Sequence, residues 1–137
     1  SVGYHKFSSA DLDARPAGQN RRPVAIPELK ANAGIQYEFE APALDGLITP
    51  RLDWFYTGSQ VYSPDRVEYN QDGYSLVNAR LTYANLEHDF TIAAGVTNLF
   101  KQFYWRNYFI YQAIGYPQIN GQPGAPREWY LTLSKRF

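Results

Sequence analysis

Polar and apolar side chains alternate along this chain, and the alternation limits its fold more than any other feature. In residues 30–40 every even position is polar or glycine and every odd position is apolar: Lys30, Asn32, Gly34, Gln36, Glu38 and Glu40 against Ala31, Ala33, Ile35, Tyr37 and Phe39. Successive side chains of a β-strand point to opposite faces, so the segment predicts one strand with a polar and an apolar face. No comparable apolar stripe has the helical period of about 3.6 residues.

Four further segments alternate in a similar way: residues 47–57, 74–86, 89–100 and 127–137. Residues 2–7 predict the end of one more strand. The chain therefore holds about six strands of roughly ten residues, the length with which a tilted strand crosses a bilayer. Pro50 has no N–H to donate, which counts against full pairing at that point. Lys135 puts a charge on the apolar parity, from which its ammonium can snorkel to water.

The connections between these segments differ in length. Residues 41–46 and 85–89 are short, and Asp45-Gly46 is a turn signal. Residues 8–27, 58–73 and 102–126 are long, and loops above about 12 to 15 residues are uncommon in compact domains unless they are functional. Long loops at one end and short turns at the other are typical of outer-membrane β-barrels.

Alternation alone also fits a soluble antiparallel sandwich or barrel, whose apolar faces would point to a core. Three features favour the membrane barrel. Small residues, such as Ala79 and Ala94, stand at mid-strand on the apolar parity, where a soluble core needs bulk. The chain ends on an aromatic residue of that parity. Rings also stand near the strand ends, as an interfacial girdle requires: Tyr37, Phe39, Trp54, Tyr56, Tyr83, Phe90, Trp129 and Phe137.

Composition excludes several classes of site and partner. The chain of 137 residues has no Cys, which excludes disulfides and Cys–zinc sites. Thirteen basic residues balance thirteen acidic ones, so there is no basic excess for nucleic acid. The absence of Met leads us to expect a processed, trimmed or partial chain. With 12 Tyr, 8 Phe and 3 Trp but only 19 % charged residues, the chain is rich in rings and poor in charge, as a sheet with exposed rings would be.

Three strings resemble the C-terminal part of a TonB-dependent outer-membrane receptor. Residues 95–101, Gly-Val-Thr-Asn-Leu-Phe-Lys, followed by Tyr104, resemble the family's Asn-Leu-Phe stretch late in the barrel. Residues 74–83 resemble the strand before it, and residues 123–137 resemble the last loop and the closing strand that ends on Phe. The resemblance covers roughly residues 25–137, and Lys135 departs from it where such proteins often carry an aromatic residue.

The resemblance implies an all-β, antiparallel transmembrane barrel in the bacterial outer membrane. Residues 1–137 would form about six C-terminal strands of a barrel of about 22 strands whose lumen holds a plug. The plug and the earlier strands would lie outside the chain, and the edges at residues 2–7 and 129–137 would be unpaired without them. The implied partners are outer-membrane lipid, the rest of the receptor, and TonB through the plug.

The resemblance also implies a function, which is active uptake of a scarce ligand: a ferric siderophore-like chelate, a cobalamin or a glycan. It implies neither an enzyme nor a cofactor. Two other functions stay open. A soluble β-sandwich could grip a sugar or another ligand with its loop rings, and an outer-membrane enzyme barrel would need a catalytic constellation that the sequence does not display.

The two long connections 58–73 and 102–126 hold the candidate ligand contacts. Rings beside an arginine suit a flat, anionic or catecholate-like ligand through stacking and cation–π contact. Alternatively, the first half of the second connection simply continues the hairpin above the membrane and its rings pack on neighbours. His5 and His88 lack partners at metal-ligand spacing, so we expect no metal site. The candidates are Tyr62, Arg66 and Tyr69 in the first connection, and Tyr104, Trp105, Arg106, Tyr108 and Tyr111 in the second.

Overall fold

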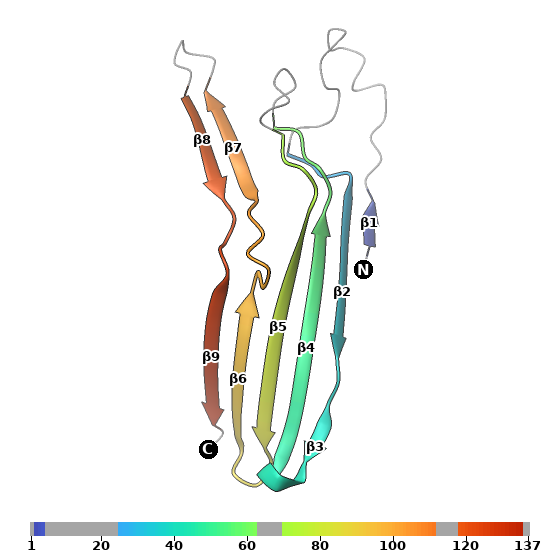
Figure 1. The fold of residues 1–137 in the computed structure, drawn as a ribbon, viewed down its shortest axis with the longest axis vertical. Coiled ribbons are helices and arrows are strands. Elements are labelled where there is room, and N and C mark those ends of the chain that lie inside the picture. The colour runs from blue at the N-terminus through green and yellow to red at the C-terminus, as the bar shows by residue number, and fades with distance from the viewer. Residues whose placement is uncertain (1, 5–24, 63–69, 112–117, 136–137) are drawn as a thin grey trace. The chain divides into compact units, whose positions relative to one another are not determined.

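A computed structural model describes residues 2–4, 25–62, 70–111 and 118–135 of the chain, which are almost entirely strands and turns (Figure 1). None of the described helices is long and apolar enough to span a membrane. The elements are β1 (Val2–Tyr4), β2 (Leu29–Gln36), β3 (Phe39–Ala41), the 3-10 turn η2 (Pro42–Leu44), β4 (Gly46–Thr57), β5 (Tyr74–Asn85), β6 (Phe90–Thr97), β7 (Trp105–Tyr111), β8 (Gln118–Pro123) and β9 (Glu128–Lys135).

One sheet contains seven of the described strands. Its path is β1-β2-β4-β5-β6-β9, with β3 also on β4, and β7 pairs with β8 in a separate sheet. The strand pairs with a defined register are antiparallel. The six strands along the path match the six predicted from alternation. Within the described residues β1 and β9 end the path, which confirms the two predicted open edges.

Two compact units make up the chain, and each is described by itself. Unit 1 comprises Ser1–Ala31, Tyr56–Tyr74 and Phe103–Gly124; unit 2 comprises Asn32–Phe55, Ser75–Gln102 and Ala125–Phe137. Most of each long connection belongs to unit 1. Unit 2 holds the two short turns and most of the alternating strand segments.

Both short turns form where they were predicted. Asp45 has φ 49°, in the left-handed region, and its N–H donates to the Pro42 carbonyl at 3.3 Å. In the turn of residues 86–89, the Asn85 side-chain oxygen accepts a hydrogen bond from the His88 N–H at 2.7 Å. The two turns and the end of β9 lie at the same end of unit 2 (Figure 1). We call this the turn end.

The prediction of one unbroken strand over residues 30–40 was wrong, because the pairing is interrupted between β2 and β3. Phe39 lies opposite Ile48, and the same register puts Tyr37 opposite Pro50. The Tyr37 N–H donates to the Pro50 carbonyl at 3.2 Å, but proline has no N–H with which to return a bond. The interruption therefore follows from Pro50, as its place in the sequence had indicated.

The predicted long connection over residues 102–126 lies between β6 and β9 and contains the β7–β8 strand pair. Tyr108 lies opposite Gly121, and a register shift occurs between Trp105 and Asn107. The strand pairing that the alternative proposed is therefore present, whereas ligand contact by this segment stays a prediction. Strand β6 ends at Thr97, earlier than predicted, because the chain turns at Asn98.

The registers place the apolar parities of neighbouring strands on one face. Leu81 lies opposite Ala94, which in turn lies opposite Leu131. Directly opposed residues point to the same side of a sheet. Thr91 and Ser134 are opposed on the other parity and share the polar face. Leu131 is 75 % exposed, so nothing in the described structure covers this apolar face. We call it the lipid face.

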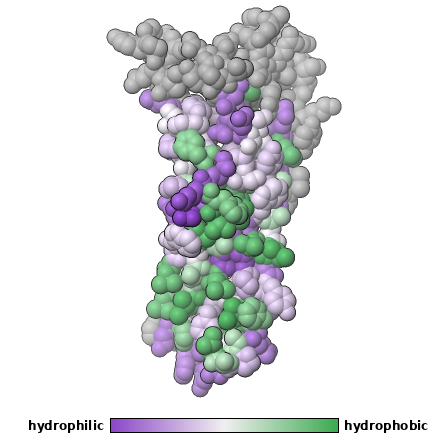
Figure 2. All heavy atoms as spheres, in the orientation of Figure 1, coloured by the Kyte–Doolittle hydropathy of each residue, from purple (hydrophilic) through white to green (hydrophobic). Residues whose placement is uncertain are grey.

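Aromatic residues occur toward both ends of the strands in unit 2. At the turn end Tyr37 stacks on Phe39 with ring centroids 6.2 Å apart, whereas Trp129 lies near the start of β9. The strand rises about 20 Å from Trp129 to Lys135, comparable with the roughly 25 Å apolar band of a membrane barrel. Hydrophobic side chains gather over unit 2 and hydrophilic ones toward the turn end (Figure 2). Phe137, also predicted for the girdle, lies outside the described residues.

The facing assignment can be tested with two neighbouring positions of β9. Leu131→Arg would place a guanidinium on the lipid face, at a cost of about 2 to 4 kcal/mol near mid-membrane. We expect this variant to fail in assembly, and Thr132→Arg, on the polar face, to assemble. The measurement is the yield of heat-modifiable protein in purified outer membranes. Equal yields of the two variants would contradict the assignment.

Candidate functional site

Four aromatic side chains of unit 1 pack together, and we call them the ring cluster: Tyr62, Phe103, Trp105 and Tyr108. Tyr62 meets Tyr108 edge-to-face, with centroids 5.1 Å apart. Trp105 lies 5.0 Å from Tyr108 and 5.0 Å from Phe103. Two segments far apart in sequence therefore contact each other through their rings.

Hydrogen bonds fix the ring cluster between these segments. Gln60 and Gln71 exchange backbone hydrogen bonds of 2.8 and 2.9 Å. The Gln71 side-chain oxygen accepts a bond of 2.8 Å from the Trp105 N–H, which ties the hairpin to the first segment. The Tyr62 hydroxyl donates to the Gln60 side-chain oxygen at 2.7 Å and lies 3.2 Å from the Arg106 carbonyl. No sequence signal singled out Gln60 or Gln71.

Tyr62 is an internal member of the ring cluster, with only 6 % of its surface exposed. Burial raises the pKa of the Tyr62 hydroxyl, and it raises that of Tyr108 too. Both phenols are therefore neutral at physiological pH. The ring cluster offers ring faces and neutral hydroxyls, without phenolate charge.

Tyr104 belongs to a separate ring pair in unit 1. It stacks on Tyr74 with centroids 4.5 Å apart and planes 19° from parallel. Its ring covers Gly124, where a Cβ would collide with it, and the Gly124 N–H donates to the Tyr104 carbonyl at 2.8 Å. Gly121 likewise makes room for the Trp105 ring, which would lie 2.6 Å from a Cβ there.

The structure brings together three predicted contact residues, Tyr62, Trp105 and Tyr108. Tyr104 pairs with Tyr74 instead, and Arg106 is exposed. These rings pack on neighbouring rings, as the alternative in the sequence analysis proposed. Their contact with a ligand stays a prediction. Arg66, Tyr69 and His5 lie outside the described residues, and of Tyr111 the structure describes only the backbone in β7.

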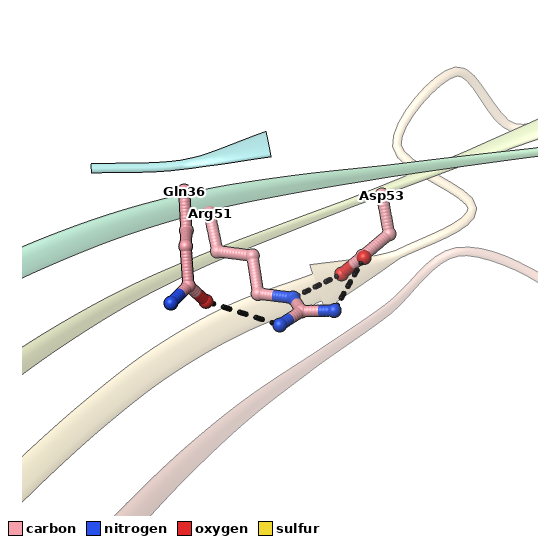
Figure 3. A network of polar contacts seen from close by, with 3 residues as sticks. All are labelled: Gln36, Arg51 and Asp53. Atoms are coloured by element: carbon pink, nitrogen blue, oxygen red, sulfur yellow. Dashed lines mark hydrogen bonds and ion pairs between the residues drawn. The ribbon is translucent and has the colours of Figure 1, made fainter. Parts of the chain in front are cut away.

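A polar network stands on the face of β2 and β4 opposite the lipid face (Figure 3). The Arg51 guanidinium donates to both carboxylate oxygens of Asp53, at 2.8 and 2.7 Å, and to the Gln36 side-chain oxygen at 3.1 Å. Gly34 leaves room for it, because a Cβ there would lie 2.7 Å from an Asp53 oxygen. A polar groove of about 380 Å³ lies beside these residues. An exposed pair of this kind adds little stability, so the network serves to line this face with polar groups.

The Asn-Leu-Phe string proves to be a structural motif. Asn98 is 4 % exposed and has φ 49°. Its side-chain amide donates to the carbonyls of Gln102 and Ala125 at 2.8 and 3.1 Å, and its oxygen accepts from the Gln102 N–H at 2.8 Å. Its N–H donates to the Asn78 side chain at 3.0 Å. Asn98 thus fastens the turn after β6 to the chain that enters β9.

An open antiparallel sheet with one exposed apolar face and one polar face is the arrangement expected of a wall of a transmembrane β-barrel. The family model "TonB dependent receptor-like, beta-barrel" matches residues 1–99. The chain therefore belongs to this family of receptors and transporters, which excludes the soluble sandwich. Comparisons with curated proteins and with solved structures gave no match.

The match and the resemblance cover different parts of the chain. The match spans residues 1–99, whereas the resemblance spans roughly residues 25–137. Of the three resembling strings, residues 74–83 and most of 95–101 fall inside the matched part, and residues 123–137 lie beyond it.

The fit between Trp105 and Gly121 can be tested by substitution and rescue. Gly121→Val should force the Trp105 ring out of place and destabilise the hairpin by about 1 to 3 kcal/mol, the usual cost of overpacking. Limited proteolysis of intact cells measures the opening of this segment. Gln122→Val, at the exposed neighbouring position, serves as the control.

Trp105→Ala in the Gly121→Val background should restore part of the resistance to protease, because it removes the colliding ring. The proposed fit is wrong if Gly121→Val and Gln122→Val are cut at the same rate.

Proposed function

We propose that the chain forms the C-terminal wall of a longer outer-membrane receptor, which takes up a scarce ligand by active transport. Family membership over residues 1–99 carries this proposal. The open edges at β1 and β9 support it, because unpaired backbone groups are not tolerated in lipid. Further strands of the same receptor would pair with them, and a plug domain would fill the lumen. The long connections would then lie outside the cell and the turn end in the periplasm.

Energy for uptake would come from TonB through the plug of the longer receptor. The polar face would line the lumen beside that plug. The network of Gln36, Arg51 and Asp53 supports this assignment, because it presents paired charges and amides on the side away from lipid.

Ligand contact is assigned to the rings and cations of the long connections. Tyr62 is buried and its hydroxyl is already bonded, so its role is to hold Tyr108 in place. Trp105 is partly exposed and the Arg106 side chain is exposed, which makes both available to a ligand. Arg66, Tyr69, Tyr104 and Tyr111 complete the proposed set. A ring face beside a guanidinium favours a flat anionic ligand, and a ferric catecholate chelate is the best match among the ligand classes.

The test is uptake by whole cells that carry the receptor at its full encoded length. Cells receive a ferric catecholate, a ferric hydroxamate, cyanocobalamin or a maltooligosaccharide, each radiolabelled. We expect saturable accumulation of one ligand, and we expect deletion of TonB to abolish accumulation while leaving surface binding. Accumulation that is unaffected by loss of TonB would contradict active transport.

Arg106→Gln should weaken surface binding of that ligand about tenfold, the effect of losing one charged contact. Arg106→Lys keeps the charge but loses the planar fork. Its binding of the ligand should therefore be weaker than that of the wild type and stronger than that of Arg106→Gln. Wild-type binding by Arg106→Gln would remove Arg106 from the site and leave the transport proposal intact.

A further inference from the structure

An apolar groove of about 470 Å³ opens on the lipid face of unit 2, across β4, β5, β6 and β9. Ala79 and Ala94 are the smallest side chains of the apolar parity that line it. Leu52, Leu81 and Trp129 line the same groove and are large. Because the two alanines stand between larger neighbours, the face is hollow at mid-strand. A face that packs on other protein would fill such a hollow with a side chain.

A cation stands beside the groove at the end away from the turns. The Arg127 guanidinium lies over the Trp129 ring, 5.6 Å from its centroid. Both residues are on the apolar parity, and Arg127 directly precedes β9. Stacking on a ring leaves the N–H edge of a guanidinium able to donate, and its planar fork matches a phosphate.

The position of Arg127 and Trp129 agrees with a membrane interface. Tryptophan is enriched at the level of the lipid headgroups. With the long connections outside the cell, as in the proposed function, this end of β9 meets the outer leaflet. The apolar groove then lies at the depth of the acyl chains, below a cation at the depth of the phosphates.

We propose that the groove and Arg127 together bind one molecule of a phosphorylated, acylated lipid of the outer leaflet. One acyl chain lies on Ala79 and Ala94 beside Trp129, and a phosphate accepts hydrogen bonds from Arg127. Boundary lipid would cover the whole face without preference for its headgroup. The proposed site differs from boundary lipid because binding requires both the groove at Ala79 and Ala94 and the charge of Arg127. The inference uses the membrane orientation of the proposed function but not its ligand or its TonB dependence.

Native mass spectrometry of the full-length receptor in detergent tests the site. The probes are a bis-phosphorylated lipid A and, as the comparison that has acyl chains but no phosphate, diacylglycerol. We expect one lipid A to stay bound per receptor and diacylglycerol to be lost. Ala94→Phe fills the groove, and Arg127→Gln removes the charge; each should weaken lipid A binding about tenfold.

Two matched controls stand on the same face. Ile92→Phe adds the same ring outside the groove, and Lys135→Gln removes the cation at the opposite end of β9. Both should bind lipid A as the wild type does. The site is refuted if Ala94→Phe and Arg127→Gln bind normally, if both lipids bind equally, or if a second receptor copy occupies the face instead. Ligand uptake measured on the same variants separates this outcome from failure of the transport proposal.

Discussion

Cross-strand register is the constraint on which the rest of this structure depends. In a bilayer every backbone N–H and C=O must pair within the protein, so strands have to lie side by side along their length. A slip of one residue would exchange the two faces of a strand. The observed register avoids this, since Leu81, Ala94 and Leu131 share one face across three strands. The lipid face and the polar groove on its opposite side both follow from that alignment.

Rings placed over glycines are the second device that recurs in the fold. Tyr130 covers Gly95 in unit 2, and Tyr104 covers Gly124 in unit 1. Each glycine supplies the space that the ring of its partner strand or segment needs, and each ring shields a stretch of backbone. The same arrangement recurs at Gly121, which makes room for the Trp105 ring. The rings over Gly121 and Gly124 therefore help to hold the long connection after β6 in place.

Much of the sheet could be predicted from alternation, because successive side chains of a strand point to opposite faces. The face on which a residue lies therefore depends only on its position along that strand. The interruption opposite Pro50 also had a local cause in the missing N–H. The β7–β8 hairpin stood only as an alternative to a long loop, for an equally physical reason. Residues 105–111 carry rings on both parities, so neither face of this strand is marked as polar. Their pairing depends on Gln71 and on Gly121, and the sequence does not connect either residue to Trp105.

The sequence by itself determined the all-β class, the six alternating strands, the two short turns and the resemblance to TonB-dependent receptors. These features depend on neighbouring residues and on motifs that are continuous in the chain. Only the tertiary structure decided which rings meet, that Asn98 joins two segments, and that Ala79 and Ala94 open a groove beside Trp129. Such contacts join positions far apart in sequence. Their formation depends on the register between strands and on side-chain volumes across strands, and the alternation of polar and apolar residues along the chain does not encode either.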